Sequence, residues 1–204
     1  MKRLIASLRD ASESIAVFMG EFERGESSFR SMVDLANYSA VETLRNGRQV
    51  TIRALREEDR DDFVAAAGHI SARSLHRRFF MVRRKFSEKE ISFFVNVDFV
   101  NHVALVAALS EEGRPTIVGG ARYIVVSPGN AEVAFAILDD YQGQGIGTAL
   151  MHHLGVIARQ AGLREMIAEV LPENAAMLKV LASSKFPLST KADPGVVHVT
   201  LRLS

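Results

Sequence analysis

The chain has 204 residues, of which 48% are hydrophobic and 24% charged, and this composition supports one folded domain with a short extension and excludes a disordered or fibrous chain. Lys and Arg number 25 against 24 Asp and Glu, so the net charge gives no general attraction to nucleic acid or to an anionic membrane surface. The chain contains no cysteine, which excludes disulfides, thiol catalysis and Cys-ligated metals.

The first part of the chain is predicted to be helical. Apolar residues recur at helical spacing from Leu4 to Phe22 and indicate an amphipathic helix. Arg9 and Asp10 end the apolar run too early for a signal peptide, and no stretch is long enough to cross a bilayer. We therefore expect a helical extension over 1–39, packed on the main domain or on a second subunit as a homo-oligomer, a main domain over 40–204, and a cytoplasmic location.

The main domain is predicted to begin with a β-hairpin and several helices. Strand-like segments over 40–44 and 49–54 flank Asn46-Gly47, the pair preferred in two-residue turns. Helical patterns follow over 57–70, 72–79 and 87–95, and Ser87 with Glu90 forms a capping box for the last of them.

The second half combines a meander of strands with alternating helices and strands. The segments over 102–109, 116–126 and 131–138 are rich in Val, Ile and Ala and are separated by Gly-containing turns. The later elements are a helix over 145–160, a strand over 166–171, a helix over 174–183 and a strand over 196–203. This order predicts a mixed sheet with helices on its faces, of the α+β or α/β class, with a parallel crossover near the C-terminal end.

The most specific feature is a glycine-rich turn between a strand and a helix. Glycines at 143, 145 and 147 let the backbone approach a ligand closely, and the start of a helix directs amide groups toward a phosphate. A turn that only packs against the sheet is the alternative. A dinucleotide fingerprint would need glycine where Thr148 stands, and a P-loop would need a lysine that the turn lacks.

The spacing from Gln142 to Gly147 matches the pattern Gln/Arg-x-x-Gly-x-Gly/Ala. Together with the segments Val50–Asp59, Ser74–Phe80 and Asn174–Met177, it resembles the GNAT family of acyl-CoA-dependent N-acetyltransferases over about three quarters of the chain, from Arg48 onward. Within that family the chain resembles the bacterial protein-lysine acetyltransferases, whose domain also occurs fused to ADP-forming acyl-CoA synthetases. The resemblance implies the GNAT fold, a mixed, mostly antiparallel, twisted sheet splayed between the fourth and fifth strands, with helices on both faces.

The resemblance also implies acetyl-CoA as cosubstrate. Backbone groups of Ile137 and Leu138 would pair with the pantetheine arm as an added strand, and the side chain of Asn174 would hydrogen-bond the same arm. By residue type alone, Asn174 is equally a helix N-cap. The pyrophosphate would be bound by backbone amides of Gln142, Gly143, Gln144, Gly145, Ile146, Gly147 and Thr148. No metal is expected, because the six histidines show no ligand spacing.

Glu132, in the context Glu-Val-Ala-Phe, is the candidate general base. A lysine amine with a pKa of about 10.4 is almost fully protonated at neutral pH, so a base must take its proton. A glutamate can do so if it is partly buried or acts through a water. The alternative is an ordinary solvent-facing glutamate after a turn. Phe79 and Phe80 would line the acceptor pocket, as in relatives, or belong to the core.

The hypothesis is direct acetyl transfer to a primary amine in a ternary complex, with a protein lysine ε-amine as the first acceptor and a small amine as the second. A catalytically silent acyl-CoA-binding sensor or interaction module is the rival of a different class. The chain departs from the family's residue pattern at two positions, and both departures keep the catalytically silent alternative open. Leu181 stands where relatives often carry a tyrosine acid, and Lys185 precedes Phe186 where Gly-Phe is usual.

Overall fold

The computed structural model describes residues 34–71, 73–74, 86–111 and 113–204. Contacts divide the chain after Leu35, and Ala36–Ser204 forms one compact unit. The expected helices over 4–22 and 72–79, together with Phe79 and Phe80, lie outside the described residues.

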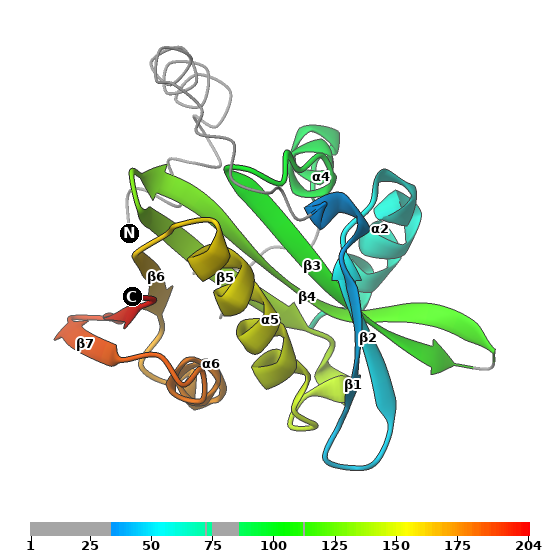
Figure 1. Ribbon diagram of the computed structural model, residues 1–204. Coiled ribbons are helices and arrows are strands. Elements are labelled where there is room, and N and C mark those ends of the chain that lie inside the picture. Colours follow the sequence, from blue (N-terminus) through cyan, green and yellow to red (C-terminus); the bar gives the residue numbers. More distant parts are fainter. Residues whose placement is uncertain (1–33, 72, 75–85, 112) are drawn as a thin grey trace. The chain divides into compact units, whose positions relative to one another are not determined.

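The described unit is built on an eight-stranded sheet in the order β1-β2-β3-β4-β5-β6-β8-β7 (Figure 1). All neighbouring strands are antiparallel except β5 and β6, which are parallel. The mixed, mostly antiparallel sheet is thereby confirmed. The strands are β1 (Ser39–Thr43), β2 (Gln49–Ala54), β3 (His102–Glu111), β4 (Arg114–Ser127), β5 (Asn130–Ile137), β6 (Glu165–Val170), β7 (Leu188–Asp193) and β8 (Val196–Arg202).

The sheet opens between β5 and β6. Their parallel pairing covers only 130–132 against 165–167. Beyond Glu132 the two strands diverge, while β5 stays paired with β4 as far as Ile137. The expected splay is therefore present, and it falls between the fifth and sixth strands when β1 of the hairpin is counted as the first.

Helices cover both faces of the sheet. Helix α5 (Ile146–Gln160) crosses one face, and α2 (Arg60–His69) and α4 (Glu88–Val95) lie on the other (Figure 1). Helix α6 (Ala175–Ala182) follows β6, and η1 (Leu35–Asn37), η2 (Glu57–Asp59) and η3 (Asp139–Tyr141) are short 3-10 turns. None of the described helices has the length and apolar composition that a membrane span requires.

The apolar stripe of α5 became a core face, as the 3.6-residue spacing predicts. Ile146, Leu150, Leu154, Ile157 and Ala158 are all at most 2% exposed. The capping box of α4 is also confirmed, because the Ser87 hydroxyl accepts from the Glu90 amide and the Glu90 carboxylate accepts from the Ser87 amide.

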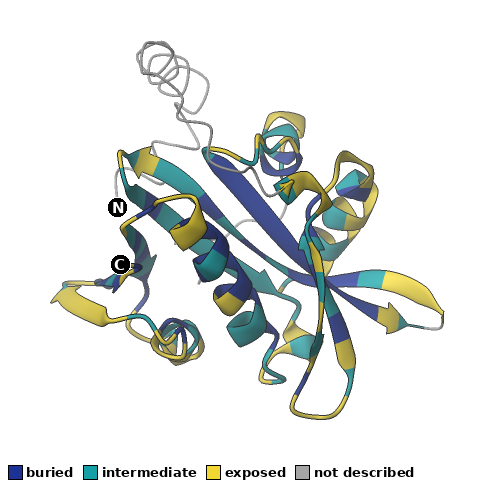
Figure 2. Ribbon diagram, viewed as in Figure 1, coloured by how far each residue is buried: buried dark blue, intermediate teal, exposed yellow. Residues whose placement is uncertain are grey.

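Strand β7 was absent from the sequence expectation, which ended with one strand over 196–203. Its first five residues are exposed and its last is partly exposed, so it carries no apolar alternation (Figure 2). It is held by backbone pairing with β8, across a turn in which Gly195 has a φ of +80°. An edge strand of this kind gives no hydrophobic signal in the sequence.

A close contact joins α5 to the segment before β7. A Cβ added at Gly155 would lie 2.5 Å from Cε2 of Phe186. Because real Cβ atoms do not approach carbon atoms so closely, this glycine is needed for packing even though it lies in the middle of a helix.

We expect Gly155→Ala to lower the free energy of unfolding by about 1–3 kcal/mol, as overpacking does. The matched control is Gly68→Ala in α2, where an added Cβ meets nothing within 4 Å. That substitution should raise stability by roughly 0.5–1 kcal/mol through helix propensity. Urea unfolding of both variants measures the difference. Equal stabilisation by the two substitutions would contradict the packing described for Gly155.

Candidate active site

The glycine turn lies where the sheet opens. After β5 ends at Ile137, η3 leads into the turn, and α5 begins at Ile146. Gly143 and Gly145 have φ angles of +76° and +100°, which other residues adopt only with strain. Gly147 is required for another reason, because its Cβ would lie 3.0 Å from the Val180 side chain on α6.

The backbone amides of this turn are available to a ligand. The amides of Tyr141 and Gln142 donate to the carbonyls of Leu138 and Asp139. By contrast, no hydrogen bond from the amides of residues 143–148 is found within the described part of the chain. Such a row of free donors at a helix N-terminus favours an anion. Gln142 was expected to add its own amide to this row, and that amide is instead used within the chain.

The backbone of β5 beside the opening requires one correction. The Leu138 amide donates to the Val118 carbonyl at 2.9 Å, and the Leu138 carbonyl accepts from Tyr141 at 3.0 Å. Both groups are used within the chain, so Leu138 does not face the opening as expected. Because successive residues of a strand direct their backbone groups to opposite sides, the groups at the opening belong to Phe135 and Ile137. Phe135 was missed, and this alternation could have identified it.

The Ile137 carbonyl at the opening has a partner in the turn. The Gln142 side chain folds back, and its Nε2 donates to the Ile137 oxygen at 3.1 Å. The first residue of the motif therefore caps the end of β5 with its side chain.

Asn174 is an N-cap. Its Oδ1 accepts from the Met177 amide at 3.2 Å at the start of α6, as its residue type predicts. Leu181, on the same helix, is completely buried and offers no proton. Lys185 adopts a φ of +64°, the left-handed conformation that a glycine would favour.

Asp139 connects the turn to the segment that follows α2. Its carboxylate accepts from the Ser71 amide at 2.9 Å, the Ser71 hydroxyl at 3.1 Å and the Ser74 hydroxyl at 2.8 Å. Burial acts to raise the pKa of Asp139, but these hydrogen bonds outweigh it and hold the pKa below its usual value. The carboxylate therefore stays ionised while its oxygens are occupied by serine donors.

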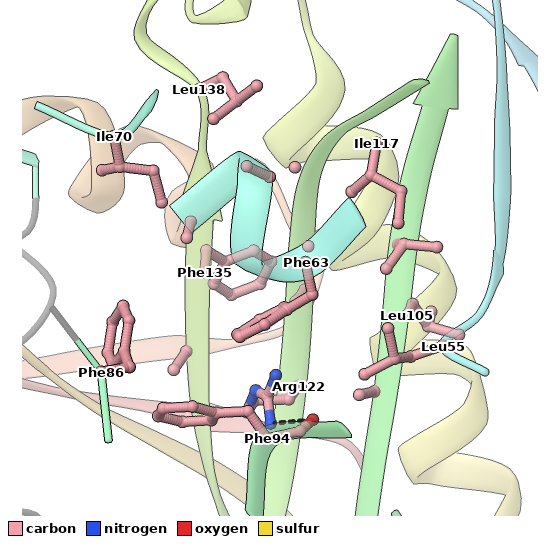
Figure 3. Close-up of a pocket in the computed structure, with 18 residues that line it drawn as sticks. Leu55, Phe63, Ile70, Phe86, Phe94, Leu105, Ile117, Arg122, Phe135 and Leu138 are labelled. Atoms are coloured by element: carbon pink, nitrogen blue, oxygen red, sulfur yellow. Dashed lines mark hydrogen bonds between the residues drawn. The ribbon is translucent and has the colours of Figure 1, made fainter. Parts of the chain in front are cut away.

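An apolar pocket lies between the sheet and the helices α2 and α4 (Figure 3). Rings from both helices face strands β3 to β5 there. Ile70 and Leu138, which immediately precede Ser71 and Asp139, both line it. Among the described residues, the aromatic side chains that line it are Phe63, Phe86, Phe94 and Phe135.

Arg122 supplies the positive charge of this pocket. Its Nη1 donates to the Phe94 carbonyl at 3.0 Å, and its guanidinium lies 4.7 Å from the centre of the Phe94 ring (Figure 3). Sequence reasoning missed Arg122. In the sequence, Arg122 stands out as a charged residue within a largely apolar strand. Which face of the sheet its side chain occupies could be assigned only from the pairing of β4 with β5.

Glu132 lies on the same face of the sheet as Arg122. The register pairs Glu132 with Ile124 and Ala134 with Arg122, and directly paired residues share a face. Ala134 and Arg122 line the pocket, whereas Glu132 lies one step further along β5 and is half-buried. The carboxylate is thus placed beside the pocket rather than in its lining.

His102 completes the polar groups on this face. Its Nε2 lies 3.0 Å from Arg122 Nη1, and the Phe93 ring stacks on it at 5.2 Å. Burial, helped by the Arg122 charge and opposed by Asp98, lowers the pKa of His102 to about 3. The ring is therefore neutral at neutral pH, and Nε2 accepts the arginine hydrogen bond.

The profile of the Acetyltransferase (GNAT) family matches residues 53–186, a range that begins at the end of β2 and includes the glycine turn and Phe186. The chain belongs to the GNAT acetyltransferase family. It is an acetyl-CoA-dependent acetyltransferase, and the free amides of the turn and the open edge of β5 fit that cosubstrate. The described residues include no group of three or more His, Asp or Glu that could hold a metal.

Several relatives share this GNAT domain. An acetyltransferase of Pseudomonas aeruginosa is 37% identical over 138 residues, which cover 67% of this chain and 74% of the relative. The acetyltransferase Pat of Mycolicibacterium smegmatis is 30% identical over 175 residues, 85% of this chain, and the chain spans only 52% of that protein.

Solved structures agree with the fold. The GNAT domain of S. lividans PAT aligns with a TM-score of 0.73 and 31% identity, over 80% of this chain and 96% of that one. An acetyltransferase structure from Salmonella typhimurium with its cofactor acetyl-CoA aligns with a TM-score of 0.62 over 76% of this chain and 94% of that one. At 20% identity, the latter supports the fold alone.

The low pKa of His102 predicts a pH-dependent stability. Between its folded pKa of about 3 and its ordinary 6.5, the unfolded chain binds the proton and the folded chain does not, so stability is lost as the pH falls below 6.5. Between pH 7 and pH 5 the natural chain should lose up to about 2 kcal/mol more than His102→Gln. Urea unfolding at both pH values measures this loss. His152→Gln, at an exposed position, is the control, and an equal pH dependence in all three proteins would contradict the assignment.

Proposed function

We propose that this acetyltransferase acetylates a protein lysine ε-amine by direct attack in a ternary complex, with Glu132 as general base. The observation that carries the proposal is the arrangement at the end of β5. The open edge of β5 borders an apolar pocket, and the same chain segment continues into the amides of 143–148, for which the described residues offer no partner. Glu132 stands on the pocket's face of the sheet.

The pocket suits a long aliphatic amine. Its described lining is apolar apart from Arg122, and aromatic rings from α2 and α4 can pack against the methylene stem of a lysine. No described lining residue is acidic, as a polyamine site would require. The relatedness to Pat of M. smegmatis and to the PAT domain of S. lividans adds support.

Arg122 also favours a second candidate. A small amine that carries a carboxylate could place it against this guanidinium, which forms bidentate contacts with such groups. An amino-acid acceptor is therefore the alternative substrate class.

The chemistry requires one proton acceptor. Deprotonating a lysine amine at neutral pH costs on the order of 4 to 5 kcal/mol, and a half-buried carboxylate beside the pocket can accept that proton directly or through a water. Because a thiol has a pKa of about 8.5, the CoA thiolate can leave without a proton donor. This is consistent with the buried Leu181 at the position where relatives often carry a tyrosine acid.

The remaining assignments belong to the same proposal. Amides of residues 143–148 would bind the pyrophosphate, the edge groups of Phe135 and Ile137 would pair with the pantetheine arm, and the Asn174 side-chain amide would contact it. Residues 40–204 would form the catalytic domain and 1–39 a helical extension. A cytoplasmic location fits intracellular acetyl-CoA.

The first test measures CoA release from acetyl-CoA with a lysine-rich protein extract and with a panel of amino acids and polyamines, and mass spectrometry locates the acetyl group. Glu132→Gln should lower turnover roughly 10²-fold or more, the typical contribution of a general base, and leave acetyl-CoA affinity unchanged. Glu165→Gln on the neighbouring strand β6 is the matched control.

Turnover of Glu132→Gln within a few-fold of the natural chain would show that another group takes the proton. Acetyl-CoA binding with no acceptor in either panel would favour the sensor function.

A second test addresses the cofactor turn. Gly145→Ala should weaken acetyl-CoA binding at least tenfold, because the added Cβ strains the conformation that exposes the amides. Gly162→Ala, at the other end of α5, carries a similar backbone strain at φ +82°. It should lower stability and leave affinity unchanged. Calorimetric titration measures both affinities, and an unaltered affinity of Gly145→Ala would contradict the role of the turn.

A further inference from the structure

The turn between β1 and β2 lies against the glycine turn. Asn46 Nδ2 donates to Gln144 Oε1 at 3.1 Å, and Gln144 Nε2 donates to the Asp140 carbonyl at 3.1 Å. The aliphatic stem of Arg45 lies over Gly145, since a Cβ there would be 3.9 Å from Arg45 Cγ. Two segments far apart in the sequence therefore form neighbouring walls of one surface.

This position of the hairpin is fixed by charge pairing. Arg48 binds Glu111 at 2.6 Å, and the Tyr141 hydroxyl of η3 donates to the same carboxylate oxygen at 3.2 Å. The Asn46 side chain also accepts from the Arg48 amide at 3.1 Å. Arg48 thus anchors the hairpin to the segment before the glycine turn, and its charge is balanced by Glu111.

Arg45 differs from Arg48 in having no such partner. It is exposed, and the described residues offer its guanidinium neither an ion pair nor a hydrogen bond. The carboxylates of Glu111 and Asp139 are occupied by other donors, and Asp140 makes no described contact with Arg45. Within the described part of the chain, a positive charge therefore borders the row of amides without a paired counter-charge.

We propose that Arg45 is a phosphate-binding residue of the acetyl-CoA site. The inference rests on the proposed cofactor turn and adds to it a cation from the turn between β1 and β2, which is distant in sequence but adjacent in the fold. A guanidinium presents paired donors that match phosphate oxygens, and a charge-assisted bond of this kind is stronger than a neutral one. The diphosphate and the 3′-phosphate of the cofactor share this chemistry.

The test is calorimetric titration, at a low and at a raised ionic strength, with acetyl-CoA and with dephospho-acetyl-CoA, which lacks the 3′-phosphate. Arg45→Ala should weaken acetyl-CoA binding roughly tenfold and reduce its salt dependence, and Arg45→Lys should recover most of the affinity. Arg56→Ala is the matched control, because Arg56 is also exposed but follows β2 at the end opposite the turn.

Comparison of the two ligands shows whether Arg45 binds the 3′-phosphate or the diphosphate. If Arg45 binds the 3′-phosphate, Arg45→Ala leaves dephospho-acetyl-CoA binding unchanged; if it binds the diphosphate, both ligands weaken equally. Affinity of Arg45→Ala within twofold of the natural chain, or an equal loss in Arg56→Ala, would overturn the inference and leave the proposed function standing. Failure of the natural chain to bind acetyl-CoA would overturn the cofactor turn and this inference together.

Discussion

The arrangement of the site depends on how early the pairing between β5 and β6 ends. Parallel pairing stops at Glu132, while β5 continues to Ile137 along β4. An unpaired strand edge is therefore created inside the sheet rather than at its border, where backbone groups can accept a peptide-like ligand as an added strand. The same strand leads through η3 into the glycine turn, so the edge and the free amides are positioned by one continuous segment.

Several of the charges around this opening are held by partners within the chain, whereas Arg45 has none among the described residues. Asp139 precedes a turn suited to anions, yet its carboxylate is held by serine donors from the segment after α2. The nearby carboxylate of Glu111 is held by Arg48 and Tyr141. On the pocket's face, the neutral ring of His102 accepts from Arg122 and adds no second positive charge there. The contacts of Glu111 and Asp139 also tie the hairpin and the segment after α2 to η3, which leads into the glycine turn.

The sequence was sufficient where a local pattern determines the outcome. The α5 stripe, the capping box and the glycine turn each follow from spacing or from a required φ. The hairpin expected around Asn46-Gly47 is also present, but its turn has three residues, 45–47, instead of two, because Leu44 bonds to Arg48 across it and only Gly47 has a positive φ there. Features that depend on register or on distant packing were not predictable. Leu138 could not be separated from Ile137 without the pairing to β4, and Arg122 could not be assigned to the pocket's face. The packing role of Gly147 appears only when α6 is in place.

The hydrogen bond from the Gln142 side chain to the Ile137 carbonyl has a consequence for solubility. An open strand edge in a sheet is a template on which any extended segment can pair, including one from another molecule. Here a side-chain amide occupies the last carbonyl of the edge, and the chain turns into η3 directly afterwards. The exposed edge is thereby kept short. A ligand with its own amides can replace one glutamine contact, whereas a foreign strand finds too few free groups for a stable ladder.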